Sequence, residues 1–222
     1  MIPPKQNAAF VACMEDVLEL YCRPYDPRVP AVNMDEQPVQ LVRETRSPIP
    51  AAPGQLMRYD YEYERNGTAN VFLFVEALGG WRRASVRERK TAVDWAEEVR
   101  RLLEEDYPDA EKVILICDNL NTHTIASLYK AFCPARARRL ASRLEIHYTP
   151  KHGSWLNIAE SELSVLRRQC LGDRTPDLAT LEQKTQAWQR KHNERQQGVN
   201  WRFTATDARI KLKRLYPQIQ MS

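Results

Sequence analysis

The sequence predicts a mixed α/β domain in which helices cover a β-sheet. Three strand-like runs at residues 55–64, 69–78 and 81–86 follow one another directly, which is typical of antiparallel strands. After residue 90, helical and strand patterns alternate. Within Lys112–Asn119, the residues from Val113 to Cys117 are apolar without interruption and are bounded by polar residues, which indicates a strand buried on both faces. A chain of 222 residues is long enough to fold around such a core without disulfides.

The first thirty residues are expected to form an entry helix and a proline-rich linker. Apolar residues between Asn7 and Tyr21 recur at spacings of three and four, which predicts one face of a helix. Three prolines at positions 24, 27 and 30 exclude further helix. A short strand, AVNMD, should then end at Asp35. We therefore predict an entry segment at residues 1–30 and a main domain at residues 31–222.

An Asn-Gly pair predicts the first hairpin. Residues 55–64 alternate between polar and apolar side chains with a period of two, and Asn66-Gly67 separates this run from the strand-like run 69–78. Asn-Gly between two such runs favours a tight turn. We expect two antiparallel strands here, followed by a third at residues 81–86.

The second half of the chain is predicted to alternate helices and strands. Thr91 and Asp94 resemble a capping box, so a helix should run from there to about Asp106, before Pro108. The apolar strand that follows should end at Asp118. Further helices are predicted at residues 124–132, 154–171, 177–191 and 204–216, and one more strand at residues 144–150.

Charge is distributed unevenly along the chain. The net charge is +4, but from Arg136 onward 17 Lys and Arg stand against 8 Asp and Glu. This asymmetry is typical of a surface that meets a phosphate backbone, and equally of solvated helix faces. The five cysteines form no CxxC pair, which indicates neither a disulfide framework nor a zinc site. The apolar runs are too short to span a bilayer and no signal peptide is evident, so we expect a cytoplasmic protein without membrane contact.

Three acidic residues are candidates for metal-assisted chemistry. Asp35 and Asp118 end predicted strands, and Glu160 lies on a helix that could point back to the same sheet edge. Glu36 and Glu162 should face elsewhere, because of strand alternation and helix rotation. Three carboxylates are the ligand type with which two divalent cations promote phosphodiester hydrolysis. The alternative is that these acids are turn residues or helix caps.

Three segments resemble the signature blocks of a known family. MDEQPVQL at residues 34–41, ICDNLNTHT at residues 116–124 and HYTPKHGSWLNIAESELSVLRRQCL at residues 147–171 occur in the order found in bacterial insertion-sequence transposases of the mariner-like DDE superfamily. The resemblance extends over nearly the whole chain, and the last block is long and distinctive. The interval of 42 positions from Asp118 to Glu160 is longer than in compact members, so an insertion is expected to loop out at residues 133–143. The family's N-terminal helix-turn-helix region has no counterpart before Asp35.

The resemblance implies a fold, an activity and a metal. The fold would be ribonuclease-H-like, with a five-stranded mixed sheet flanked by helices. Asp35, Asp118 and Glu160 would be the catalytic acids and would bind two Mg²⁺ or Mn²⁺ ions. The protein would be a DNA transposase that cleaves DNA at the terminal inverted repeats of a transposon and joins the freed 3′-hydroxyl to target DNA. It would act as a homodimer on the nucleoid of a bacterial cell. A non-catalytic DNA-binding or assembly remnant, and a nuclease that cuts without joining, remain as alternatives.

Residues near the acids are candidates for accessory roles. His123 follows Asp118 by five positions and could orient the scissile phosphate or a metal-bound water, or it could simply cap the next helix. Asn119 is more typical of a residue that holds its own loop through backbone hydrogen bonds.

A further set of residues is predicted to contact DNA. Lys151 and His152 precede Gly153, and a glycine lets backbone approach DNA closely, although a solvated turn fits the same residues. Trp155 could stack on an unpaired base or pack in the core. Arg167 and Arg168 are candidates for a track along the phosphate backbone, together with Arg190, Lys191 and Arg195.

Overall fold

Five strands form one mixed sheet at the centre of the computed structural model, which describes residues 6–58 and 60–217. The strand order is β3-β2-β1-β4-β5. The β1, β2 and β3 strands pair antiparallel, whereas β1 with β4 and β4 with β5 pair parallel. The strands are β1 Ala31–Glu44, β2 Tyr63–Glu76, β3 Trp81–Arg87, β4 Val113–Cys117 and β5 Leu144–Tyr148. The predicted mixed sheet is confirmed.

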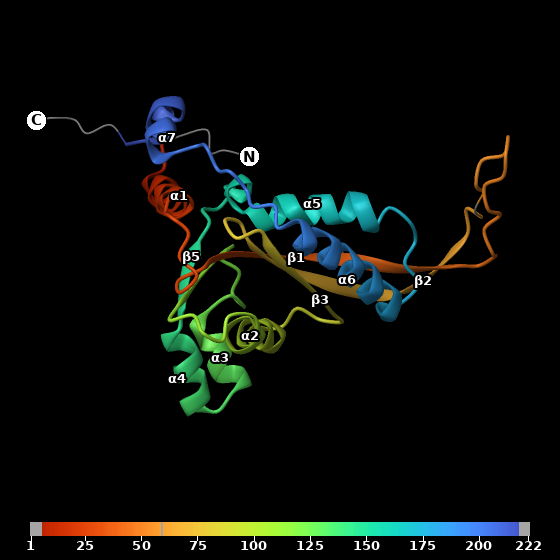
Figure 1. The fold of residues 1–222 in the computed structure, drawn as a ribbon, viewed down its shortest axis with the longest axis horizontal. Coiled ribbons are helices and arrows are strands. Elements are labelled where there is room, and N and C mark those ends of the chain that lie inside the picture. The colour runs from red at the N-terminus through yellow and green to blue at the C-terminus, as the bar shows by residue number, and fades with distance from the viewer. Residues whose placement is uncertain (1–5, 59, 218–222) are drawn as a thin grey trace, which may run out of the picture.

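Helices cover both faces of this sheet (Figure 1). One face carries α5 and α6, the opposite face carries α2, α3 and α4, and α1 and α7 lie together beyond the β5 end. The helices are α1 Ala8–Tyr21, α2 Ala92–Arg101, α3 Ile125–Ala131, α4 Pro134–Ser142, α5 Ile158–Cys170, α6 Leu178–Arg195 and α7 Ala205–Lys211. A π-helical turn, Leu102–Asp106, extends α2, and short 3-10 turns occupy Ser154–Leu156 and Lys213–Leu215.

The alternation of side chains along β2 divides the core into two clusters. Val71, Leu73 and Val75 face the α5 and α6 side, while Phe72 and Phe74 face the α2 side. Each large apolar side chain that is fully buried contributes on the order of 1.5–3 kcal/mol to folding. The entry helix α1 belongs to the first cluster, where its residues Met14, Val17 and Leu18 are fully buried.

The strand β1 is longer than predicted. It continues through Asp35 to Glu44, so Asp35 lies inside a strand and not at its end. The expected stop at Asp35 is therefore wrong, even though Pro38 follows. The proline is tolerated because the β4 ladder ends at Asn33, and among the described residues no strand pairs with that edge of β1 afterwards. Farther along, the Val42 amide donates to the Thr175 carbonyl.

The predicted Asn66-Gly67 hairpin is wrong. The strand β2 runs through this pair and stays on β1, with Gln40 opposite Thr68 and Val42 opposite Arg65. Two steps on β1 thus match three on β2, which makes a β-bulge, and Gly67 supplies the positive φ of 87°. Asn-Gly satisfies a bulge as readily as a turn, because both need a left-handed residue.

The segment between β1 and β2 forms an arm that projects from the sheet (Figure 1). Residues 55–62, predicted as a strand, hold only isolated bridges, which join Ile49 to Arg58 and Ala52 to Gln55. Tyr59 of that predicted run lies outside the described residues. The alternation in this run failed as a strand signal because, among the described residues, only isolated bridges pair with it.

Predictions for the second half of the chain are largely confirmed. The Thr91 and Asp94 capping box starts α2, and Asp177 caps α6 through the Thr180 amide. Residues 133–143, expected to loop out, instead form α4, which starts with Pro134 at its first turn and buries Ala137 and Leu140. Over residues 6–58 and 60–217, none of the helices combines the length and apolar character needed to cross a bilayer.

Candidate active site

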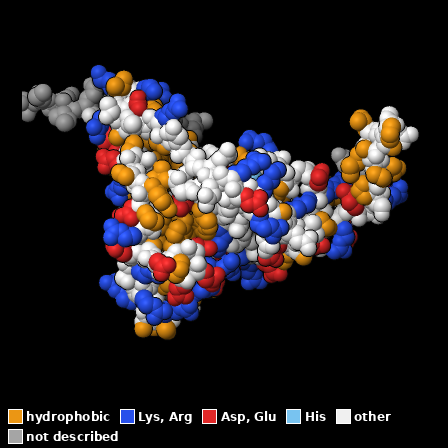
Figure 2. Space-filling view, viewed as in Figure 1, with side chains coloured by type: hydrophobic (Ala, Val, Ile, Leu, Met, Phe, Trp, Pro, Cys, Tyr) orange, Lys and Arg blue, Asp and Glu red, His pale blue; other side chains and the backbone are white. Residues whose placement is uncertain are grey.

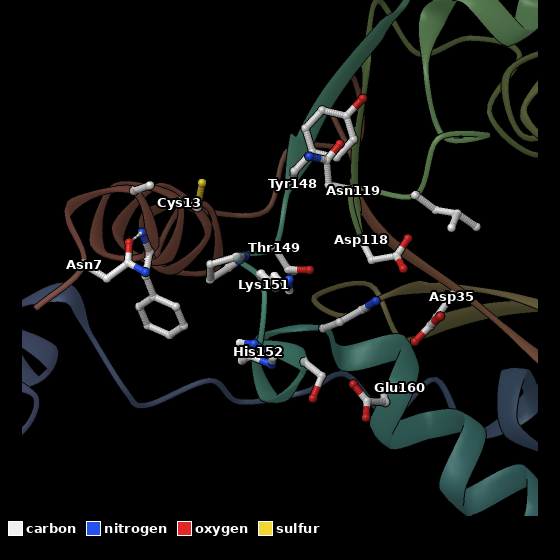
Figure 3. A pocket seen from close by; sticks show the side chains of 16 residues that line it. Asn7, Cys13, Asp35, Asp118, Asn119, Tyr148, Thr149, Lys151, His152 and Glu160 are labelled. Atoms are coloured by element: carbon white, nitrogen blue, oxygen red, sulfur yellow. Dashed lines mark hydrogen bonds between the residues drawn. The ribbon is translucent and has the colours of Figure 1, made fainter. Parts of the chain in front are cut away.

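Three acids from separate elements surround one cavity of about 620 Å³. Asp35 comes from the middle of β1, Asp118 directly follows β4, and Glu160 lies in the first turn of α5. Figure 3 shows the three side chains around a common hollow, with Lys151 and His152 on the adjoining loop. Folding thus brings together residues that stand 83 and 42 positions apart in the sequence.

Asp35 is the acid most strongly influenced by its surroundings. It is half-buried on β1, and one carboxylate oxygen accepts the Glu36 amide at 2.8 Å. Burial raises the pKa of Asp35 to about 7, and the negative charges of Glu36, Asp118 and Glu160 add to this shift. Asp35 is therefore easier to protonate than an exposed aspartate, and a nearby cation would favour its charged form.

Asp118 is held in place by His123. The His123 Nδ1 lies 2.7 Å from Asp118 Oδ1, and its Nε2 lies 3.3 Å from Glu36 Oε2. The imidazole is 1% exposed and stacks on Trp95. Burial alone would lower the pKa of His123, but the neighbouring Asp118, Cys117 and Glu36 side chains outweigh it and raise the pKa to about 12. The same bond lowers the pKa of Asp118. His123 therefore contacts the acid directly, rather than only capping α3.

Glu160 is exposed, as Asp118 is, but it differs from the two aspartates in having no bonding partner for its carboxylate among the described residues. Its helix is capped by Asn157, and a carboxylate in the first turn of a helix is stabilised by the positive end of the macrodipole. Within the described part of the chain, its carboxylate makes no hydrogen bond or ion pair. Glu162, two positions later, forms an ion pair with Arg82 at 2.7 Å and faces away, as predicted. Glu160 is thus the acid that is most free to bind a ligand.

The donor set fits a hard divalent cation. Carboxylate oxygens are the ligands that Mg²⁺ and Mn²⁺ prefer. Among the residues that the structure describes, no three His, Cys, Asp or Glu side chains stand close enough together to hold a metal ion. The acids nevertheless line one cavity and repel one another electrostatically, as the raised pKa of Asp35 indicates. The site therefore combines the right ligand type with an excess of negative charge.

The loop after β5 forms the opposite side of the cavity. Lys151 and His152 both line it, and both are exposed. His152 has φ of 67°, a left-handed conformation that a residue other than glycine adopts at a cost. Gly153 is required for another reason than predicted, because a Cβ there would approach the Pro150 ring to 2.5 Å. The glycine closes the turn, and an approach of DNA to it stays a prediction.

The remaining candidate site residues differ in whether they line the cavity of the acids. Asn119 lines the cavity. Trp155 is half-buried and packs edge-on against Phe203 at 5.7 Å, which fits the core alternative, so its contact with DNA stays a prediction. Arg167 and Arg168 are exposed in the last turn of α5, more than one helical turn from Glu160.

Two features of the site were not predicted from the sequence. The entry helix contributes Asn7, Phe10 and Cys13 to the cavity wall, although it was expected to be a separate segment. No periodicity signals such a contact, since it depends on where α1 packs. Glu36 faces away from Asp35 as predicted, but it is buried against His123 and so takes part indirectly.

Comparisons with known proteins agree on the kind of domain. A family model described as DDE superfamily endonuclease matches residues 30–182. Among solved structures, the chain is similar to the Mos1 strand transfer complex, with 16% identity, a TM-score of 0.56, and coverage of 85% of this chain and 56% of that one. It is also similar to the Mos1 mariner paired end complex with Mn, with 15% identity, a TM-score of 0.54, and coverage of 89% and 60%. Comparison with curated proteins finds no match.

The fold agrees with the expectation drawn from the signature blocks. The likeness to the Mos1 structures confirms a ribonuclease-H-like sheet flanked by helices. The chain spans less than two thirds of the length of these Mos1 chains. All three acids fall inside the range that the family model matches.

Proposed function

The chain belongs to the DDE superfamily of endonucleases, and we propose that it is the catalytic domain of a DNA transposase. It cleaves DNA at transposon ends in the presence of a divalent metal and joins the freed 3′-hydroxyl to target DNA. The observation that carries this proposal is the cavity lined by three carboxylates from β1, β4 and α5. The solved structures to which the fold is similar are described as a paired end complex and a strand transfer complex.

Asp35, Asp118 and Glu160 would hold two Mg²⁺ or Mn²⁺ ions. Similar structures are described as complexes with Mn and with Mg, which supports this choice of metal. When bound, such ions neutralise charge on the phosphate oxygens and help to activate the attacking hydroxyl. Asp35 lines the same cavity as the other two acids and would hold the cations together with them.

The chain's own residues prepare the site for DNA. His123 keeps the Asp118 carboxylate in one orientation. Lys151 provides an exposed positive charge on the cavity wall opposite the acids, where a phosphate of the backbone would lie. Asn119, His152, Trp155, Arg167 and Arg168 complete the set of proposed accessory and DNA contacts.

Neutral substitutions of the acids test the activity. We expect Asp35→Asn, Asp118→Asn and Glu160→Gln each to reduce cleavage of a transposon-end duplex in Mg²⁺ by about 10³-fold or more, because several kcal/mol of transition-state stabilisation is lost. Glu162→Gln is the matched control, since Glu162 lies on the same helix but pairs with Arg82. Full-rate cleavage by a folded variant of any of the three acids would exclude that acid.

A strand-transfer assay separates this function from its alternatives. A duplex with a pre-cut 3′-end is incubated with target DNA and Mg²⁺ or Mn²⁺. A transposase joins the two, whereas a simple nuclease only cuts and a non-catalytic remnant does neither. Joined product that disappears with Asp118→Asn supports the proposal.

The arm supports a homodimer. Large apolar side chains are exposed along it, among them Leu56 at 88% and Tyr61 at 85%, and Figure 2 shows hydrophobic side chains gathered on this projection. Contiguous exposed apolar surface marks a contact site. We expect light scattering to give a dimer mass for the wild-type chain or its DNA complex and a monomer mass for Leu56→Lys with Tyr61→Lys. An unchanged mass would remove the arm from the interface.

A further inference from the structure

Helix α5 is fastened to strand β1 by the side chain of Asn157. This residue is 2% exposed, and its two polar atoms reach in opposite directions. The Nδ2 donates to the Met34 carbonyl at 3.1 Å, and the Oδ1 accepts from the Ala159 amide at 3.1 Å. One amide therefore connects the residue before Asp35 to the residue before Glu160.

A second buried contact reinforces this connection. The Tyr21 hydroxyl of α1 donates to the Leu156 carbonyl at 2.5 Å and also contacts the Asn33 side chain. Leu156 precedes Asn157, and Asn33 precedes Met34. Two adjacent residues of β1 are thus tied to two adjacent residues of the loop that starts α5.

These bonds bear on the distance between Asp35 and Glu160. Metal binding would require that distance to be short, whereas repulsion between the two carboxylates favours a longer one. Asp35 and Glu160 carry like charges, so without a counter-charge they repel each other. Metal ligands must stand within about 0.5 Å of their productive positions to bind well. Because the bonds are buried, they are stronger than solvated ones and expensive to break.

We propose that Asn157, supported by Tyr21, is a positioning residue that sets the distance of Glu160 from Asp35. This inference rests on the proposed metal-dependent function, and it adds a residue that holds the α5 acid to the β1 acid. Asn157 lines the cavity of the acids, but its Nδ2 and Oδ1 are both bonded to backbone groups, so the role assigned to it is positioning and not ligand binding.

Asn193 offers a matched control. Its Nδ2 donates to the Arg82 carbonyl at 2.7 Å and its Oδ1 accepts the Arg82 amide at 2.9 Å, so it ties α6 to β3 by the same two-ended bridge. Neither Asn193 nor Arg82 lines the cavity of the acids. Loss of this bridge should affect the fold while leaving the bond between Asn157 and Met34 in place.

The test compares Asn157→Ser with Asn193→Ser. Serine keeps the ability to cap α5 but is too short to reach Met34. Binding of Mn²⁺ alone is titrated by electron paramagnetic resonance without DNA, and the Mg²⁺ concentration for half-maximal cleavage is measured separately. We expect a lower melting temperature for both variants. Asn157→Ser should bind Mn²⁺ about tenfold more weakly, with cleavage restored by excess Mg²⁺, while Asn193→Ser should bind like wild type.

Wild-type Mn²⁺ affinity in a folded Asn157→Ser variant would overturn the inference. If this variant does not fold, Tyr21→Phe decides, because it removes only the supporting hydroxyl. A clear loss of Mn²⁺ affinity in that variant supports the inference, and unchanged affinity overturns it. If the wild-type chain binds no Mn²⁺ that Asp35→Asn abolishes, the proposed function fails, and the inference fails with it. If the wild-type chain binds Mn²⁺ and cleaves while the positioning variants behave normally, only the inference fails.

Discussion

Two groups of acidic side chains in this molecule differ in what surrounds them. Glu98 of α2 is fully buried, yet Arg83 and Arg87 contact its carboxylate, Arg101 lies at 3.5 Å, and Ser85 donates a hydrogen bond at 2.9 Å. Burial would raise the pKa of Glu98, but these guanidinium groups outweigh it and lower the pKa. The acids around Asp35 face mainly one another, and the pKa of Asp35 rises.

The difference separates a structural cluster from a functional one. The Glu98 group contains its own counter-charges, so its electrostatics are satisfied once the chain has folded. In the group around Asp35, His123 contacts Asp118 and Glu36, and Lys90 lies 3.7 Å from Glu36, but no ion pair is found for Asp35 or Glu160 among the described residues. A surplus of negative charge that folding leaves in place is what a site for external cations requires.

The largest effect on stability is expected when the charge of Glu98 is removed from the structural cluster. Glu98→Gln should lower the free energy of unfolding by about 3–5 kcal/mol, because three arginines lose their buried partner. Glu97→Gln, at a partly exposed pair with Arg100 on the same helix, should cost less than about 1 kcal/mol. Urea denaturation measures both. Equal effects would mean that Glu98 does not stabilise the fold in this way.

Removing a charge from the functional cluster should change the free energy of unfolding in the opposite direction. In metal-free buffer at pH 8, Asp35→Asn should raise the free energy of unfolding by up to about 4 kcal/mol. The variant no longer places a buried negative charge beside other carboxylates in the folded state. The wild-type pKa of about 7 lies above the unfolded value near 3.8, so wild-type stability falls as pH rises through this window. Denaturation at pH 3 is the control, where the two proteins should be alike. A destabilised Asp35→Asn at pH 8 would contradict the comparison.

Metal should remove the penalty that burial imposes on the functional cluster. Mn²⁺ at 100 times its dissociation constant should stabilise the wild-type chain by about 2.7 kcal/mol. Asp118→Asn should lose most of this gain, whereas Glu97→Gln should keep it. Melting curves with and without Mn²⁺ measure the difference, and an equal gain in Asp118→Asn would exclude Asp118 as a ligand.

The smallest expected effect concerns DNA binding outside the acid cluster. Arg167→Ala with Arg168→Ala should weaken the salt dependence of DNA affinity, with a change in slope of about 0.9 for each phosphate that the protein no longer neutralises. Arg209→Ala, on α7 and paired with Glu15, should leave the slope unchanged. Fluorescence anisotropy over a range of salt concentrations tests this, and a slope that stays constant would place the DNA elsewhere.

The sequence predicted the elements that local patterns specify, and failed where distant contacts decide. The capping box of α2, the buried strand before Asp118 and the apolar face of α1 are local signals. Whether Asn66-Gly67 makes a turn or a bulge depends instead on whether β1 lies alongside, as it does. The same holds for the length of β1 past Pro38.

The candidate acids were named from their sequence blocks, but their environment was not predictable. The contact of His123 with both Asp118 and Glu36 depends on β1 and β4 being neighbours. The two-ended bond of Asn157 requires that α5 cross β1 at Met34. Each contact joins residues whose separation in the chain exceeds the range of any helix or strand periodicity, apart from that of Asp118 with His123.

Pro38 has a consequence for how the molecule behaves at high concentration. Beyond Asn33, the outer edge of β1 has no strand partner among the described residues, and such an edge is a template for intermolecular β-sheet growth. A proline there cannot donate the backbone hydrogen bond that an incoming strand needs, and the Thr175 carbonyl already occupies the Val42 amide. The long strand that carries the first acid is thereby protected against aggregation along its own length.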